Sequence, residues 1–486
     1  MKYEPVIGLE VHAQLLTKSK IFSPSSAAFG GEPNTQVDPV CLGLPGVLPV
    51  LNERAVAFAM RMGLATKCRI ARHSVFARKN YFYPDLPKGY QISQFEEPIC
   101  EHGYLEIDLD REAKRIGIAR IHLEEDAGKS IHAEEFVGEN ETLVDVNRCG
   151  VPLIEIVSEP DIRSPREAAL YLTQIRQIVQ YLNICDGNME EGSLRCDANI
   201  SVRLVGTEPF GVKTELKNMN SFKGVEKALE FEIARQIELL ESGGTVIQET
   251  LLWDASRNVA ISMRSKEYSD DYRYFPDPDL VPLVISQDWV DEVKESLPEL
   301  PRARRNRLVA EYQIPSYDAE VLTDTRELAD YFEAVASESG DAKAASNWVM
   351  GEVLRVLKEE CLNVGQISVK PAALGRLIKL VAEGAISGKI AKKVFAEMAA
   401  TGKEPDTVIR EQGLVQISDA GAIREKVVAV LDANPAEVEK YLAGKEQVIG
   451  FLVGQVMRET RGQANPKVVN EILQEELQKR ISLNRQ

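Results

Sequence analysis

The chain lacks the common glycine loops that bind nucleotides. Neither Gly-x-x-x-x-Gly-Lys-Ser/Thr nor a strand-linked Gly-x-Gly-x-x-Gly occurs in its 486 residues. Any ATP site must therefore hold metal-bound phosphates on a sheet face rather than in a P-loop.

Paired cysteines and long apolar runs are also missing. The seven cysteines are odd in number and scattered without a disulfide framework, which indicates reduced thiols. No signal peptide and no apolar stretch of membrane-spanning length occurs. We therefore expect a soluble, multidomain, cytoplasmic protein.

Positive charge and histidine are scarce as well. The net charge of −17 argues against a nucleic-acid partner, because phosphate contacts need Lys or Arg, although it averages over surfaces that face different partners. One local basic run, at 302–307, is either a solvated helix start or a nucleic-acid contact. All five histidines precede residue 133, which confines any histidine chemistry to the N-terminal part.

Segment 78–94 combines cations, amides, hydroxyls and three tyrosines. Pro84, Pro87 and Gly89 stop both a helix and a regular strand. Rigid polar loops of this kind bind substrates, so we expect a binding loop rather than a solvated turn.

Two acidic clusters flank this loop in the sequence. Strict alternation over 7–15 places Glu10 and His12 on one strand face, where they can share a divalent cation. Glu124 or Glu125 on a second strand, with Glu155 as a third acid, can complete the shell. The alternative is that Glu10 and His12 lie on a solvated sheet face.

A further strand is expected after a Gly-Ser turn, within 190–203. Its alternation places Arg195, Asp197 and Asn199 on one face. Arginine suits phosphate oxygens, and the other two suit hydroxyls or a metal-bound water.

The pattern changes near residue 295. Before it, strands alternate with turns and with amphipathic helices at 164–182 and 224–242; after it, the pattern is helical. We expect an α+β protein with three domains, at 1–295, 296–407 and 408–486.

Several long motifs resemble the B subunits of the aspartyl/glutamyl-tRNA amidotransferases. The resemblance covers essentially the whole chain. Its motifs are Gly8-Leu-Glu-Val-His-Ala-Gln-Leu15, Cys41-Leu-Gly-Leu-Pro-Gly46, Ile121-His-Leu-Glu-Glu-Asp126, and the segments 32–35, 78–94, 194–203 and 450–458.

This resemblance implies a two-step reaction on tRNA. ATP and Mg²⁺ phosphorylate the side-chain carboxylate of a glutamate or aspartate misacylated onto tRNA(Gln) or tRNA(Asn), and ammonia displaces the phosphate. The ammonia comes from a separate amidase (A) subunit, and a small C subunit supports the pair. The implied fold is a mixed α/β catalytic domain with a glutamine-synthetase-like core, an all-α domain and a small all-α tail.

The resemblance also implies roles for individual residues. Glu10, His12 and Glu125 would hold Mg²⁺, with Glu124 and Glu155 as further ligands. Lys79 and Lys88 would contact the phosphates, and Lys88 with Glu125 would control the entry of ammonia. Lys88 can instead form a structural ion pair. The nucleotide is assigned to Arg195, Asp197 and Asn199.

One motif of the resemblance is altered. Some relatives carry four zinc-binding cysteines where this chain has Ser23, Ser25, Asp38 and Cys41. A structural zinc needs four good ligands, so we predict none.

The C-terminal tail allows two interpretations. Arg458, Arg461 and Lys467 would touch tRNA by resemblance, whereas periodicity favours a small helical core. Both can hold together.

Two other functions compete with the implied one. A non-catalytic tRNA-binding scaffold for an amidase would show no ATP turnover. A self-contained glutamine-hydrolysing enzyme is disfavoured, because the chain has neither an N-terminal catalytic cysteine nor an amidase signature. The preference between glutamyl-tRNA and aspartyl-tRNA stays open.

Overall fold

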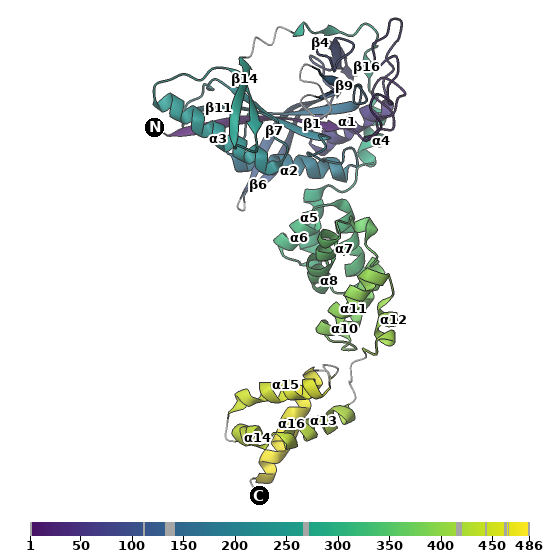
Figure 1. The fold of residues 1–486 in the computed structure, drawn as a ribbon, viewed down its shortest axis with the longest axis vertical. Coiled ribbons are helices and arrows are strands. Elements are labelled where there is room, and N and C mark those ends of the chain that lie inside the picture. The colour runs from purple at the N-terminus through teal and green to yellow at the C-terminus, as the bar shows by residue number, and fades with distance from the viewer. Residues whose placement is uncertain are drawn as a thin grey trace. The chain divides into compact units, whose positions relative to one another are not determined.

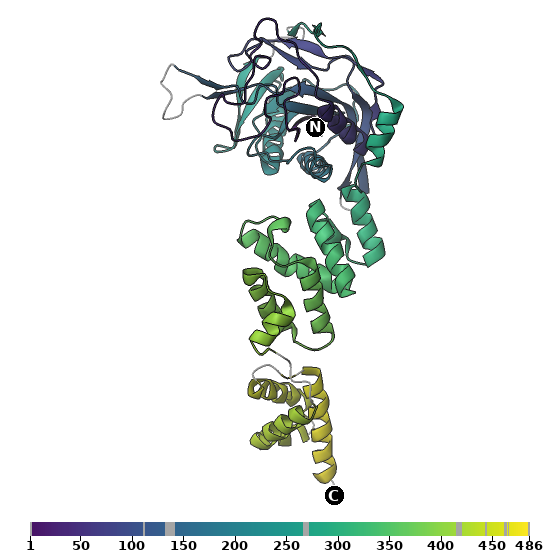
Figure 2. The same cartoon turned by 90° about the vertical axis from the view of Figure 1, so that its right-hand side faces the viewer.

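The protein consists of a sheet-containing part followed by a helical part, as drawn in Figure 1 and, from the side, in Figure 2. The chain divides into two compact units, Met1–Pro301 and Arg302–Gln486. The predicted α+β class is therefore confirmed. The computed structural model describes residues 2–109, 112–131, 141–265, 272–414, 420–442, 445–460, 464 and 466–484.

A 12-stranded, mainly antiparallel sheet forms the centre of the first unit. β6 (Cys100–Leu109) pairs with β7 and with β2 (Arg69–Ile70), and two small sheets pair β3 (His73–Ser74) with β16 (Leu283–Val284) and β8 (Lys129–Ile131) with β9 (Leu143–Asp145). The main path runs in the order β14 (Val259–Ser265), β13 (Glu249–Asp254), β12 (Thr214–Lys217), β11 (Leu194–Leu204), β1 (Tyr3–Gln14), β10 (Pro152–Ser158), β7 (Glu112–Glu125), β5 (Tyr90–Ser93), β4 (Ala77–Asn80) and β15 (Phe275–Pro276).

One face of the sheet is apolar and carries the core. Leu9, Val11 and Ala13 of β1 are fully buried, as the alternation over 7–15 requires. Helices α1 (Glu53–Ala65), α2 (Pro165–Tyr181) and α3 (Phe222–Glu241) contribute to the same hydrophobic core. Each fully buried aliphatic side chain stabilises the fold by about 1.5–3 kcal/mol. The opposite face is therefore free to carry polar groups.

The helices that cover this face begin at capping residues. Ser164 accepts a hydrogen bond from the backbone N–H of Glu167, and the next residue, Pro165, is the first residue of α2. Ser221 caps α3 in the same way. The helices predicted at 164–182 and 224–242 are confirmed, and α4 (Gln287–Glu295) packs on α1.

The second unit is helical throughout its described part and holds two separate hydrophobic cores. A π-helical turn, Val349–Val353, joins α8 to α9. The first core is built from α5 (Pro301–Tyr312), α6 (Ser316–Leu322), α7 (Arg326–Ser339), α8 (Ala342–Trp348), α9 (Leu354–Glu359), α10 (Pro371–Ala382), α11 (Gly388–Thr401) and α12 (Pro405–Glu411), and the second from α13 (Ala420–Ala433), α14 (Pro435–Leu442), α15 (Ile449–Glu459) and α16 (Pro466–Asn484).

The predicted domain boundaries fall at two different kinds of place. Residue 295 ends α4, close to the division between the two units. Residue 408 lies inside α12, where Val408 and Ile409 belong to the first helical core. The three-domain division stays a prediction. Within the described residues, the helices are all too short or too polar to span a membrane.

Candidate active site

A row of polar side chains crosses four neighbouring strands on the face opposite the core. The strand registers pair Arg195 of β11 with His12 of β1, His12 with Glu155 of β10, and Glu155 with His122 of β7. Residues paired directly across an antiparallel ladder point to the same face. Long-range pairing thus brings these residues together.

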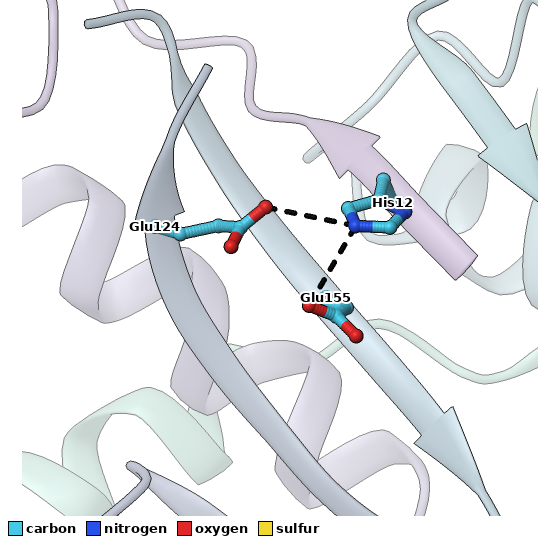
Figure 3. Close-up of side chains that lie close together, drawn as sticks. All are labelled: His12, Glu124 and Glu155. Atoms are coloured by element: carbon cyan, nitrogen blue, oxygen red, sulfur yellow. Dashed lines mark ion pairs between the residues drawn. The ribbon is translucent and has the colours of Figure 1, made fainter. Parts of the chain in front are cut away.

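Three of the predicted metal ligands lie in contact. The Nε2 atom of His12 lies 3.6 Å from Glu124 Oε1 and 3.6 Å from Glu155 Oε2. Figure 3 shows the two carboxylates pointing at this imidazole nitrogen from separate strands. One donor atom from each residue lies within 4.8 Å of the others, close enough to ligate one cation.

His122 joins them as a fourth member that the sequence analysis left without a role. Its Nε2 lies 3.2 Å from Glu155 Oε2 and 3.8 Å from Glu124 Oε2. The signal was present in the sequence, since His122 and Glu124 are two apart on one strand, as are Glu10 and His12. His12, His122, Glu124 and Glu155 are called the carboxylate–imidazole cluster below.

Burial and mutual attraction set the charges in the carboxylate–imidazole cluster. Burial disfavours a charged imidazole at His12, but Glu155 and then Glu124 raise the pKa of His12 to about 9. Burial also opposes ionisation of Glu155, yet the imidazoles of His122 and His12 hold the pKa of Glu155 well below its usual value. Without a metal, the carboxylates are therefore ionised and His12 is protonated at neutral pH.

The donor set fits a hard divalent cation. Two carboxylates and one imidazole suit Mg²⁺ or Mn²⁺ better than a soft metal. Replacing the His12 proton by a cation would keep the buried carboxylates compensated, as buried charges require.

Glu10 lies beside this cluster rather than within it. Its carboxylate accepts a hydrogen bond of 2.8 Å from Asn199 Nδ2. Burial, followed by the nearby charges of Glu155 and Glu215, raises the pKa of Glu10. The structure therefore pairs Glu10 with Asn199, a residue that the resemblance assigns to the nucleotide.

Glu125 is held by a different set of groups. Its side chain contacts Lys88 Nζ and accepts a hydrogen bond of 2.8 Å from the backbone N–H of Ile92. Gln91 Nε2 donates to its backbone carbonyl at 2.7 Å. Strand alternation turns consecutive residues to opposite sides, so Glu124 and Glu125 do not share these contacts.

Lys79 has the properties expected of a phosphate-binding residue. Its Nζ lies over the rings of Tyr272 and Tyr81, at 5.0 and 5.9 Å from their centroids, and forms no ion pair within the described residues. Burial disfavours its charge, but Glu124 raises the pKa of Lys79. The ammonium is charged and available.

The remaining assigned residues on this face have protein partners. Arg195 Nη2 donates to Asp126 Oδ2 at 2.9 Å, and Gln14 Nε2 donates to the same oxygen at 2.8 Å. Lys217 Nζ donates to Asp197 Oδ2 at 2.5 Å. A nucleotide would have to compete with these contacts or use their outer sides.

Comparison with known proteins identifies the family. A family model described as the GatB/GatE catalytic domain matches residues 5–291, and a second, described as the GatB domain, matches 330–477. A protein of Thermodesulfovibrio yellowstonii, named as the B subunit of an aspartyl/glutamyl-tRNA(Asn/Gln) amidotransferase, is 58% identical over 97% of this chain and 99% of its own. A protein of the same name from Chlorobium phaeobacteroides is 59% identical over 98% of this chain and 100% of its own.

The chain belongs to the family of amidotransferase B subunits. The resemblance drawn from its motifs is thereby confirmed. In this chain, the stretch matched by the catalytic-domain model, residues 5–291, contains all four residues of the carboxylate–imidazole cluster.

Two of the three basic residues predicted to touch tRNA lie in the described part of the tail. Arg458 is exposed in the last turn of α15, and Lys467 is exposed near the start of α16. Arg461 lies outside the described residues. The basic run at 302–307 is partly used internally, because Arg304 and Arg307 both bind Glu333.

Ser23, Ser25, Asp38 and Cys41, the four positions for which we predict no zinc, do converge in this chain. Ser23 Oγ lies 3.4 Å from Cys41 Sγ, and Ser25 Oγ donates to Asp38 Oδ2 at 3.0 Å. The ammonium of Lys20, only 1% exposed, donates to Cys41 Sγ at 3.3 Å and to a backbone carbonyl at 2.7 Å. Hydrogen bonds among these residues therefore hold the loop together.

Proposed function

We propose that this chain uses ATP to phosphorylate the side-chain carboxylate of a glutamate or aspartate misacylated onto tRNA(Gln) or tRNA(Asn), and then amidates it with ammonia. The observation that carries the proposal is the buried carboxylate–imidazole cluster near the ammonium of Lys79, which has no ion-pair partner among the described residues. The names of the curated relatives support the same reaction class.

In this mechanism, His12, Glu124 and Glu155 would hold Mg²⁺. The bound cation would neutralise negative charge on the phosphate oxygens. Lys79 contributes a second positive charge from β4, where burial among tyrosines strengthens its attraction for phosphate. The chain thereby lowers the repulsion between the carboxylate of the substrate and the phosphoryl group it attacks.

The amidation step uses the neighbouring pair, Lys88 and Glu125. The nitrogen of ammonia attacks the acyl-phosphate carbonyl carbon, the bond from that carbon to the phosphate oxygen breaks, and the nitrogen loses a proton. Glu125, held by Lys88 and the Ile92 N–H, would accept this proton.

The proposal includes the partners and the compartment. The chain has no amidase signature of its own, so a separate amidase (A) subunit would supply ammonia, with a small C subunit supporting the two. Arg458, Arg461 and Lys467 would contact the tRNA body. All seven cysteines are free, which supports a reducing cytoplasm.

The measurement that tests this proposal is ADP formation. The chain would be assembled with its amidase and C partners and given Mg²⁺-ATP, an ammonium salt and glutamyl- or aspartyl-tRNA. We expect ADP only with misacylated tRNA and a fall of about 10²–10³-fold in Glu124→Gln and Lys79→Met. Glu125→Ala should mainly abolish amide formation. Glu230→Gln, on an exposed helix position, should match the wild type.

Absence of turnover in the wild type, or equal turnover in Glu124→Gln, would make the chain a tRNA-binding scaffold instead. We also propose that the loop around Cys41 holds no zinc, because Lys20 donates to the single thiol there. Metal analysis of the purified chain should give far less than one zinc per molecule. One zinc per molecule would refute this.

A further inference from the structure

An array of five aromatic rings borders the carboxylate–imidazole cluster. The ring centroids of Tyr83 and Tyr81 are 6.3 Å apart. Those of Tyr81 and Tyr272 are 6.1 Å apart, and those of Tyr272 and Tyr274 are 6.2 Å apart. The last pair, Tyr274 and Phe95, is stacked at 4.1 Å with an interplanar angle of 6°. Tyr81, Tyr83, Tyr272, Tyr274 and Phe95 are called the aromatic array below.

The array is exposed at its two ends and covered in its middle. Tyr83 is 58% exposed and Phe95 is 48% exposed, whereas Tyr81, Tyr272 and Tyr274 are partly buried. Covering an exposed ring with an apolar or aromatic ligand surface is favourable, because it removes apolar area from water. The ends of the array therefore present two ring faces to a ligand.

The array lies next to the reacting groups. Lys79 lies over two of its rings, Tyr81 and Tyr272. Ser93 Oγ, on the strand that leads directly to Phe95, donates to Glu124 Oε2 at 3.4 Å. Burial raises the pKa of Tyr81 most, and the negative charge of Glu124 raises it further.

The segment that carries Tyr272 and Tyr274 is fixed in place. Asn80 Nδ2 donates to the backbone carbonyl of Arg273 at 2.9 Å, and β15 pairs with β4 immediately afterwards. Arg78 holds the same segment by binding Asp277 and Asp279, at 2.9 and 2.7 Å. Because these rings are already ordered, a ligand that stacks on them loses little entropy to binding.

We propose that the aromatic array binds the single-stranded 3′ end of the aminoacyl-tRNA by stacking on its bases, with the terminal base on Phe95. This inference rests on the proposed function. Aromatic faces beside a cation are typical of sites for single-stranded nucleic acid.

Two arguments favour the tRNA end over the adenine of ATP. The terminal base and the esterified amino acid share one ribose, so the base must lie beside the group where the carboxylate reacts. The array also has an exposed ring at each of its two ends, with three rings between them, which suits a strand of several nucleotides, whereas a mononucleotide needs one ring.

Fluorescence of 2-aminopurine in place of the terminal base would test the proposal. A tRNA acceptor minihelix with this base would be titrated into the complex of the chain with its amidase and C partners. We expect strong quenching in the wild type and in Phe95→Tyr, and loss of quenching with about tenfold weaker binding in Phe95→Leu. Phe210→Leu, a 60% exposed phenylalanine beside Arg203, is the matched control and should behave as wild type.

Kinetics of the same variants separate the two nucleotides. In Phe95→Leu the KM for aminoacyl-tRNA should rise about tenfold while the KM for ATP stays unchanged. A rise in the KM for ATP alone, or undiminished quenching in Phe95→Leu, would overturn the proposal. ADP formation without quenching would reject the array but keep the proposed reaction, and quenching without ADP formation would do the reverse.

Discussion

The two units of the chain differ in how many charged side chains they bury. In the sheet unit, His122, Glu124, Glu125 and Asp126 are each 4% exposed or less. In the described part of the helical unit, Arg304 is the one charged residue of comparable burial, at 6%. Burying charge is costly unless it is compensated, so the buried charges gathered in the carboxylate–imidazole cluster indicate that chemistry takes place there.

The helical unit follows the ordinary pattern for a supporting structure. Its cores are apolar, and pairs such as Arg355 with Glu359 and Lys379 with Glu338 lie at the surface. Exposed pairs of this kind contribute about 0–1 kcal/mol each. Substitutions in the two units should therefore affect different measurements.

The largest effect is expected from His12→Ala. Removal of this ligand should weaken Mn²⁺ binding by about a hundredfold or more, because the two carboxylates lose the imidazole that completes the donor set. Electron paramagnetic resonance of free Mn²⁺ measures this directly. His73→Ala removes an exposed histidine that pairs with Glu97 and serves as the control. Equal affinities in both variants would contradict the assignment.

The pH dependence of Mn²⁺ affinity should be the next largest effect. With the pKa of His12 raised to about 9, the metal must displace a proton, so affinity should rise about tenfold per pH unit from pH 7 towards pH 9. Glu155 stays ionised in this window because its pKa is depressed. The stability of the metal-free fold depends on pH in the opposite direction. Protonated His12 stabilises that fold fully below about pH 6.5, and this stabilisation is lost as the pH rises through about 9.

The same titration on His12→Ala provides the check. Its slope should be clearly shallower than that of the wild type. A wild-type affinity that does not change between about pH 7 and 8.5 would show that His12 is neutral before the metal binds.

The smallest effect is expected in the helical unit. Arg304 binds Asp330 and Glu333, so Arg304→Met should destabilise this unit by about 1–3 kcal/mol. Thermal unfolding measures the loss, and Arg355→Met should stay within about 0.5 kcal/mol of the wild type. Mn²⁺ affinity should be unchanged in both. A loss of Mn²⁺ affinity in Arg304→Met would contradict the expectation that substitutions in the two units affect different measurements.

Local patterns predicted much of this arrangement. Alternation over 7–15 is enough to separate the buried Leu9 from the polar His12, and a serine followed by proline marks the start of α2. These signals depend only on neighbouring residues, so one sequence suffices to read them.

The composition of the site was harder to predict because it depends on register. His122 enters the carboxylate–imidazole cluster only because β7 pairs with β10 so that Glu155 lies opposite it. The sequence also left the choice between Glu124 and Glu125 open, and the contacts of Lys88 with Glu125 distinguish them. Likewise, Asn199 faces Glu10 through a pairing between distant strands.

The place of β1 in the middle of the sheet has a consequence for biosynthesis. This strand is synthesised before its two neighbours in the sheet, β10 and β11, which end at Ser158 and Leu204. A nascent chain must therefore keep both hydrogen-bonding edges of β1 from pairing wrongly while the next two hundred or so residues are synthesised, about 10–40 s at ordinary elongation rates. Both edges of β1 can be paired only after β11 has been synthesised, and a chain that ends before β11 would leave one of these edges open to wrong pairing.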